Sequence, residues 1–175
     1  MYIHYKQKKG YDILSLAITC GALYRPLIEE ENEYWRFIVA NFLHIDTWQL
    51  WINVYAIYYV GNFIEQYVGW LAYSYIILMA CLVTMITIYC LQKRSMETII
   101  SLGAGGIFNG LLGALLAIAI LMPDTSLLKY LIPVIGITFF LSVWRPQITK
   151  TGYLGGFVGG FLAILILSIS GLCIS

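Results

Sequence analysis

Gly103-Ala-Gly-Gly-Ile-Phe-Asn-Gly-Leu-Leu-Gly-Ala114 is a glycine-rich turn that opens into an apolar helix. The apolar sequence continues to Met122, which predicts a membrane-spanning helix over residues 106–122. Small residues recur along this helix at Gly106, Gly110, Gly113 and Ala117. Because small residues let helices approach closely within a membrane, this stripe predicts a tight helix–helix contact.

A second glycine-rich stretch near the end of the chain supplies a matching surface. Gly152-Tyr-Leu-Gly-Gly-Phe-Val-Gly-Gly160 contains three pairs of glycines that are four residues apart. We expect its small face, which includes Gly156 and Gly160, to pack against the stripe on residues 106–117. The same spacing also serves helix dimerisation, so a homo-oligomer is the alternative.

The composition places the chain in a membrane. Of 175 residues, 61% are hydrophobic and 11% are charged, and the mean hydropathy is +0.82. A soluble domain carries about 25% charged residues, so membrane lipids are the expected surroundings. The predicted spans use nearly the whole chain, and we expect no separate soluble domain and no nucleic-acid partner. The four cysteines lack metal-ligand spacing, and we expect no metal and no cofactor.

Apolar segments separated by short polar breaks predict an all-α membrane protein, a bundle of six transmembrane helices forming a single domain over residues 1–175. The predicted spans are 11–27, 48–64, 70–91, 106–122, 127–144 and 152–170. Each is about 16 to 22 residues long, which fits a bilayer core of roughly 30 Å. The first loop, residues 28–47, is too polar to span, and we expect it to associate with the membrane surface.

Three polar residues stand at the start of the second span. Gln49 and Asn53 are four residues apart and therefore share a helical face. A polar side chain within a span is costly, and for Asn53 it indicates either helix-to-helix hydrogen bonding or a functional site. For His44, just before the span, we expect a structural role as a buried ring that binds the backbone of the loop.

Five elements in order resemble the rhomboid intramembrane serine proteases. They are Trp35-Arg36, His44 with Asn53, Glu65 with Gly69, the 103–114 helix and the 153–160 helix. The resemblance implies the six-helix rhomboid-like fold, with Glu65 capping the turn after the second span. It also implies structural roles for Trp35, Arg36, His44, Glu65, Gly110, Gly113, Gly156 and Gly160. For Trp35-Arg36, the alternative is an interfacial anchor with the arginine at the headgroups.

The positions that carry proteolysis in that family differ here. Gly105 stands in place of the nucleophilic serine, Tyr153 in place of the general-base histidine, and Gln49 in place of a histidine that stabilises the oxyanion. Glycine has no oxygen with which to attack a carbonyl. A phenol with a pKa near 10 is a poor base at neutral pH. The resemblance therefore indicates a rhomboid pseudoprotease, in which Tyr153 fills the vacated space.

A scaffold without its catalytic groups predicts a binding protein. We expect it to bind a transmembrane segment of a partner membrane protein, for escort, assembly, sequestration or stability control. The expected cleft lies between the second and fifth helices, with Gln49, Asn53, Gly105 and Tyr153 as its floor. The alternatives are a structural subunit of a membrane complex, a lipid-perturbing or scrambling protein, and a residual intramembrane serine protease that uses Ser101.

The basic tail Lys6-Gln-Lys-Lys9 favours a cytoplasmic N-terminus, as does the family resemblance. The basic residues of the later loops do not confirm this orientation by the positive-inside rule. Short loops and a bare six-helix core favour a multi-pass protein of a bacterial plasma membrane.

Overall fold

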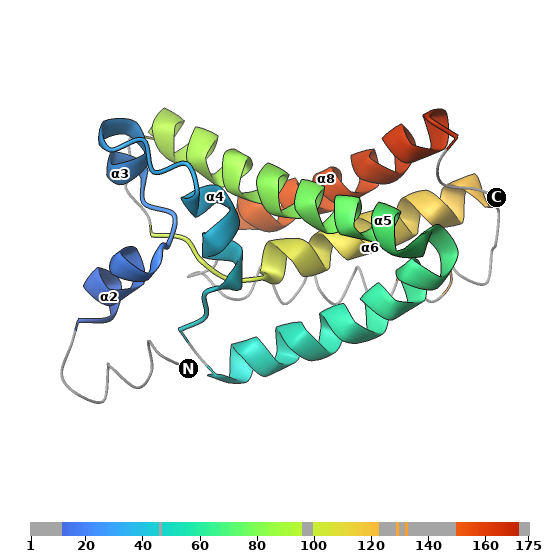
Figure 1. Cartoon of the computed structure of the whole chain (residues 1–175), viewed down its shortest axis with the longest axis horizontal. Helices are drawn as coiled ribbons and strands as arrows, with labels where there is room; N and C mark the ends of the chain where they lie inside the picture. Colours follow the sequence, from blue (N-terminus) through green and yellow to red (C-terminus); the bar gives the residue numbers. More distant parts are fainter. Residues whose placement is uncertain are drawn as a thin grey trace.

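The computed structural model describes residues 12–45, 47–95, 100–122 and 150–171, together with residues 129 and 132. The predicted fifth span, 127–144, therefore lies outside the described residues apart from those two positions. The elements are α2 (Ile13–Cys20), α3 (Arg25–Glu30), α4 (Arg36–Val39), η1 (Ala40–Phe42), α5 (Thr47–Ser95), α6 (Gly105–Leu121) and α8 (Lys150–Ile169). Within the described residues the fold is helical, and its β-structure is a single isolated bridge (Figure 1).

The long helix α5 is a hairpin of two limbs, residues 47–68 and 70–95, and Figure 1 shows the chain folding back between them. Gly69 forms the turn with φ 78° and ψ 164°, a backbone conformation that is essentially confined to glycine. The two limbs correspond to the predicted spans 48–64 and 70–91. Each limb continues four residues further than predicted, because apolar and aromatic residues extend the helix up to the turn and into the following polar segment.

The helices α6, α8 and the second limb of α5 pack together through small residues. A Cβ built on Gly160 of α8 would lie 2.9 Å from the Cα of Gly110 on α6, so the two backbones are in direct contact. Gly106 of α6 lies against Thr84 of α5. The close contact between α6 and α8 that the glycine spacing predicts is present.

A buried apolar cluster surrounds these glycine contacts. It includes Ile76, Leu111, Leu112, Ala163 and Ile164, which come from α5, α6 and α8. The glycines bring the helix axes close, and the larger side chains fill the space beside them. The core thus fixes the start of α6, which carries Gly105.

The first apolar segment is helical over a shorter range than predicted. The predicted span covers residues 11–27, but α2 ends at Gly21, which has a left-handed φ of 107°. The chain then runs extended, and Leu23 and Ser101 exchange two backbone hydrogen bonds of 2.8 and 3.1 Å. Eight helical residues rise only about 12 Å, which is less than a bilayer core. The left-handed glycine is the physical reason for the interruption.

Arg36 ties the first loop to the end of α2. Its side chain is 3% exposed, and Nη1 donates hydrogen bonds to the carbonyl oxygens of Ile18 (2.7 Å) and Ala22 (2.9 Å). Its Nε and Nη2 each lie 2.6 Å from Oε2 of Glu33, and its Cζ is 4.7 Å from the centre of the Trp35 ring. The guanidinium therefore binds one carbonyl in the last turn of α2 and one just after the helix instead of pointing to lipid headgroups.

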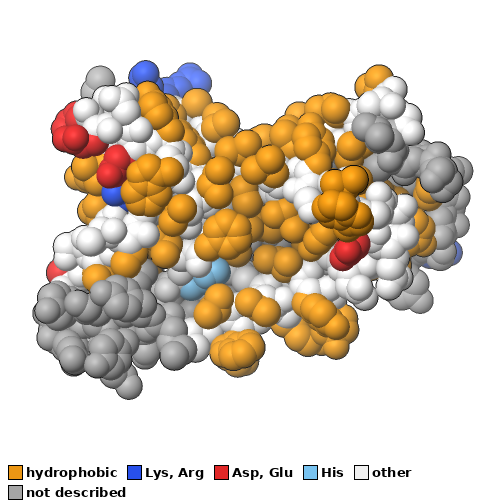
Figure 2. Space-filling model, in the orientation of Figure 1, with side chains coloured by type: hydrophobic (Ala, Val, Ile, Leu, Met, Phe, Trp, Pro, Cys, Tyr) orange, Lys and Arg blue, Asp and Glu red, His pale blue; other side chains and the backbone are white. Residues whose placement is uncertain are grey.

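In the described part of the chain, two helices are long and apolar enough to cross a membrane: α5, over Leu50–Arg94, and α8, over Gly152–Ile169. The helix α6 is also apolar but shorter, at 17 residues. Figure 2 shows one face of the molecule, on which hydrophobic side chains gather over the central part and the charged side chains of the described residues are few. The fold class is thus a mostly helical, membrane-type bundle, and the described residues do not confirm the count of six spans.

Candidate functional site

Gly105 and Tyr153 are in direct contact where α6 begins. Gly105 is the first residue of α6 and is buried. A Cβ built on it would lie 2.9 Å from both Cζ and Oη of Tyr153 on α8. The tyrosine ring therefore occupies the space into which a side chain at position 105 would point. A serine could be accommodated there only if the ring moved.

His44 joins three parts of the chain just before Gly105. Its ring is buried, and Nε2 lies 2.9 Å from Nδ2 of Asn53 on α5. The backbone N–H of Ala104 donates to the same nitrogen at 3.3 Å. Because both neighbours are donors, the arrangement assigns an acceptor role to Nε2 and the proton to Nδ1. Burial lowers the pKa of His44, which favours this neutral form.

An open groove of about 480 Å³ begins at this histidine. Its wall is mainly apolar, and its lining comes from η1, both limbs of α5 and the start of α6. The polar groups in it are Asn41, His44, Asn53, Tyr58, Asn62, Glu65 and Tyr73. Such a groove, apolar with a few polar groups, is a typical binding surface.

The groove contains only part of the floor that the sequence predicts. Asn53 lines it, whereas Gly105 and Tyr153 are absent from its lining because they pack against each other beside it. The side chain of Gln49 lies outside the described structure. The structure therefore brings Asn53 and His44 to the groove and sets the Gly105–Tyr153 pair apart from it.

Glu65 is expected from the sequence to cap the turn after the first limb. In the structure the turn depends on Gly69, and Glu65 is an exposed residue of the groove. Among the described residues its carboxylate makes no hydrogen bond and no ion pair. The turn is thus a backbone feature of glycine, and the carboxylate faces outward.

Asn41 is a site residue that the sequence analysis missed. It is 0% exposed, and its Nδ2 donates to the carbonyl oxygens of Phe37 (3.0 Å) and Ile38 (3.2 Å). These bonds close the turn between α4 and η1 at one end of the groove. An asparagine inside the apolar run from Phe37 to Leu43 was the available signal. Asn62 and Tyr58 were likewise polar positions within a predicted span.

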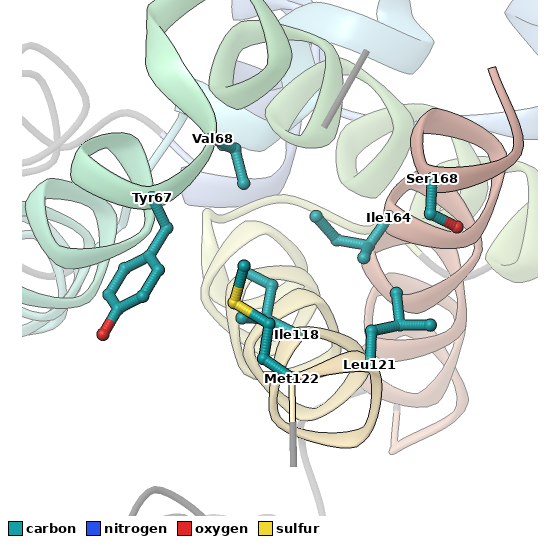
Figure 3. Close-up of a pocket in the computed structure, with 7 residues that line it drawn as sticks. All are labelled: Tyr67, Val68, Ile118, Leu121, Met122, Ile164 and Ser168. Carbon is teal, nitrogen blue, oxygen red and sulfur yellow. The ribbon is translucent and has the colours of Figure 1, made fainter. Parts of the chain in front are cut away.

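A second pocket lies at the opposite end of α6, among the C-terminal turns of α6 and α8 and the end of the first limb of α5 (Figure 3). Tyr67, Val68, Ile118, Leu121, Met122, Ile164 and Ser168 line it. Its volume is about 20 Å³, room for about one water molecule, compared with about 480 Å³ for the groove. In Figure 3 the Tyr67 hydroxyl points away from the pocket, so its lining is apolar apart from Ser168. The larger groove is therefore the candidate site.

The helices α6 and α8 pack through glycines. His44 and Asn53 form a buried pair beside the first turn of α6, where Gly105 has no side chain. These features define a polytopic helical membrane protein with a buried polar pair at the start of one helix. The sequence from residue 31 to residue 170 matches the Rhomboid domain family. The chain belongs to the rhomboid family.

The relatives of this chain include one protein that is named a protease and one that is named inactive. The chain is 30% identical to RHOMBOID-like protein 5 of Arabidopsis thaliana over 84% of its own length and 48% of the relative's. It is 29% identical to Rhomboid protease GluP of Bacillus subtilis (strain 168), over 87% and 29% of the two lengths. It is 28% identical to Inactive RHOMBOID-like protein 8 of Arabidopsis thaliana, over 79% and 39%. The chain thus spans about half or less of the length of these relatives.

Proposed function

We propose that this protein is a catalytically inactive rhomboid that binds a transmembrane segment of a partner membrane protein in the groove along the first limb of α5. The observation that carries the proposal is the contact between Gly105 and Tyr153. At the nucleophile's position there is no side-chain oxygen, and the ring of Tyr153 fills the space where one would lie. The groove beside this contact remains open.

Loss of catalysis follows from the chemistry of the three altered positions. Glycine offers no nucleophile, and an unperturbed phenol is protonated near neutral pH and accepts a proton poorly. Gln49, at the third position, retains a hydrogen-bond donor. The name of one relative, Inactive RHOMBOID-like protein 8, supports the proposal, because the family contains a member that is named inactive.

Ser101 does not provide a replacement nucleophile. It is 5% exposed and is held in the backbone bridge to Leu23. Its Oγ has no hydrogen-bond partner among the described residues, so no base activates it there. A serine-reactive fluorophosphonate should therefore leave the purified protein unlabelled, whereas labelling that disappears in Ser101→Ala would contradict the proposal.

Binding is supported by the chemistry of the groove. Its wall is largely apolar, which suits a lipid-soluble segment, and its polar groups can satisfy polar atoms of that segment. Escort, assembly, sequestration and stability control are all consequences that such binding can have. The proposal includes the six-helix topology, a cytoplasmic N-terminus and a bacterial plasma membrane as the location.

The direct test is to purify the tagged full chain in a mild detergent and to identify the membrane proteins that remain bound at near-stoichiometric amounts. Val54→Trp places a bulky ring in the groove, since Val54 lines it and is 48% exposed. Ile86→Trp is the matched control, because Ile86 is also 48% exposed but lies on the other limb, outside the groove. We expect one partner that is lost in Val54→Trp and retained in Ile86→Trp. A partner retained in both would place the binding surface elsewhere.

A lipid-acting role is the second candidate, and the short helices are the observation that favours it. The 17 residues of α6 rise about 25 Å, less than a bilayer core of roughly 30 Å. Such a mismatch thins the surrounding bilayer. Scrambling of fluorescent phospholipids in vesicles that contain only this protein would support this candidate over partner binding.

A structural subunit of a membrane complex is the remaining alternative. Such a subunit would co-purify with several proteins, and Val54→Trp would not change which proteins are bound.

A further inference from the structure

Among the described residues that line the groove, Glu65 is the only charged one. It is exposed on the first limb of α5, close to the turn at Gly69. The two ion pairs among the described residues join Arg25 to Glu29 and Arg36 to Glu33, and neither involves it. In the described part of the chain the carboxylate is thus available to a group from outside.

A carboxylate at the edge of an apolar groove has a clear electrostatic preference. At a membrane boundary it is less well solvated than in bulk water, and an opposite charge stabilises it more strongly than it would in water. Lys93 and Arg94 lie at the far end of the second limb, away from the turn. No cation of the described residues forms an ion pair with Glu65, so the molecule that occupies the groove can supply the complementary charge.

Asn53 provides a second polar point on the same limb. Its Nδ2 is engaged with His44, whereas its Oδ1 makes no hydrogen bond within the described residues. Glu65 follows Asn53 by twelve residues, which corresponds to about 18 Å along the helix. Between these points the groove is lined by the apolar side chains of Val54 and Ile57 and by the polar side chains of Tyr58 and Asn62.

We propose that the occupant of the groove is a transmembrane helix with a lysine or arginine that pairs with Glu65 and a hydrogen-bond donor that meets Asn53. This inference rests on the proposed function and specifies the chemistry of the partner. The two groups stand about eleven residues apart in the partner, because eleven residues are about three helical turns and rise about 16 Å. The intervening face of the partner is apolar.

The experiment measures binding of fluorescent synthetic helices to the full chain in lipid nanodiscs. Two leucine-based helices have the same composition and carry one asparagine and one lysine. In the first the two residues are eleven positions apart and share a face, and in the second they are nine apart and point to opposite faces. A third helix carries leucine in both places. We expect the first helix to bind about fivefold to tenfold more tightly than the other two, which corresponds to one interhelical polar contact.

Glu65→Gln keeps the shape of the side chain and removes its charge. We expect this variant to lose the preference for the first helix and to bind all three alike. Glu30→Gln is the matched control, since Glu30 is an exposed carboxylate on α3 outside the groove, and its preference should be unchanged. A thermal unfolding curve for each variant distinguishes lost recognition from lost folding.

The possible outcomes separate the inference from the function on which it rests. If all three helices bind equally and Glu65→Gln changes nothing, the groove binds helices but the charge pairing is wrong. If none of the three synthetic helices binds, both the proposed helix-binding function and the proposed pairing with Glu65 are wrong. If Glu65→Gln alters only the enrichment of phosphatidylethanolamine around the protein, the carboxylate recognises a lipid amine and the inference is overturned.

Discussion

Gly105 and Tyr153 are complementary in size, because the tyrosine ring fits only where position 105 has no side chain. The ring of Tyr153 lies against the Cα of Gly105, so any Cβ there meets aromatic carbon atoms. Restoring serine at position 105 alone would therefore produce a steric clash with the ring of Tyr153. The pair explains why both positions depart from that pattern together.

We predict that Gly105→Ser alone lowers the free energy of unfolding by about 1–3 kcal/mol, the usual cost of overpacking a core. Tyr153→His shortens the opposing side chain, so the double variant should recover about 0.5–3 kcal/mol relative to additive effects. Thermal unfolding in detergent measures all four proteins. Additive effects of the two substitutions would contradict the contact.

At the scale of single elements, the helix pair α6–α8 was the most predictable part of the fold. Glycines four residues apart constrain geometry directly, because backbones can approach only where side chains are missing. The short α2 was not predictable in this way. It ends before the left-handed Gly21, where an added Cβ would lie 2.5 Å from the ring of Trp35 and 3.0 Å from Val39. Such contacts come from distant sequence and are absent from local hydropathy.

The glycines of the bundle also differ in how much they tolerate a side chain. At Gly160 the neighbours of an added Cβ are backbone atoms of Gly110, which cannot rotate away. At Gly61 the neighbour is the side chain of Tyr73, which can move. The first position therefore fixes the distance between two helices, and the second only restrains a ring.

We predict that Gly160→Ala destabilises the protein by at least about 1–3 kcal/mol, because α6 and α8 must separate to admit the methyl group. Gly61→Ala is the matched control and should cost clearly less. Reversible unfolding in mixed detergent micelles compares the two variants with the unmodified chain. Equal costs at the two glycines would show that backbone contact does not limit the packing of these helices.

At the scale of the whole molecule, the sequence suggested candidate positions for the site but could not predict how they are arranged. The sequence identified Asn53, Gly105 and Tyr153 from their places in the rhomboid pattern. It could not show that Tyr153 covers Gly105 and leaves the groove to other residues, since that depends on how α8 packs on α6. It also treated Glu65 as a cap, because a motif does not indicate which way a side chain points.

His44 connects the loop, α5 and α6, and its protonation state therefore bears on the whole fold. The hydrogen bond from the N–H of Ala104 requires an unprotonated Nε2. Burial lowers the pKa of His44 in the folded state below the ordinary value of 6.5. The unfolded chain consequently takes up a proton near pH 6.5, at which the folded protein still excludes it.

We predict that the contribution of His44 to stability is complete above pH 6.5 and declines as the pH falls from 6.5 toward the folded-state pKa. The slope approaches about 1.4 kcal/mol per pH unit, the value for one proton. Unfolding measured from pH 8 to pH 5 should show this decline in the unmodified chain and in His4→Gln, which removes the other histidine. In His44→Gln the decline should be absent, because glutamine can accept the Ala104 hydrogen bond without titrating. A decline that persists in His44→Gln would assign the pH dependence to other groups and leave His44 as a packing residue.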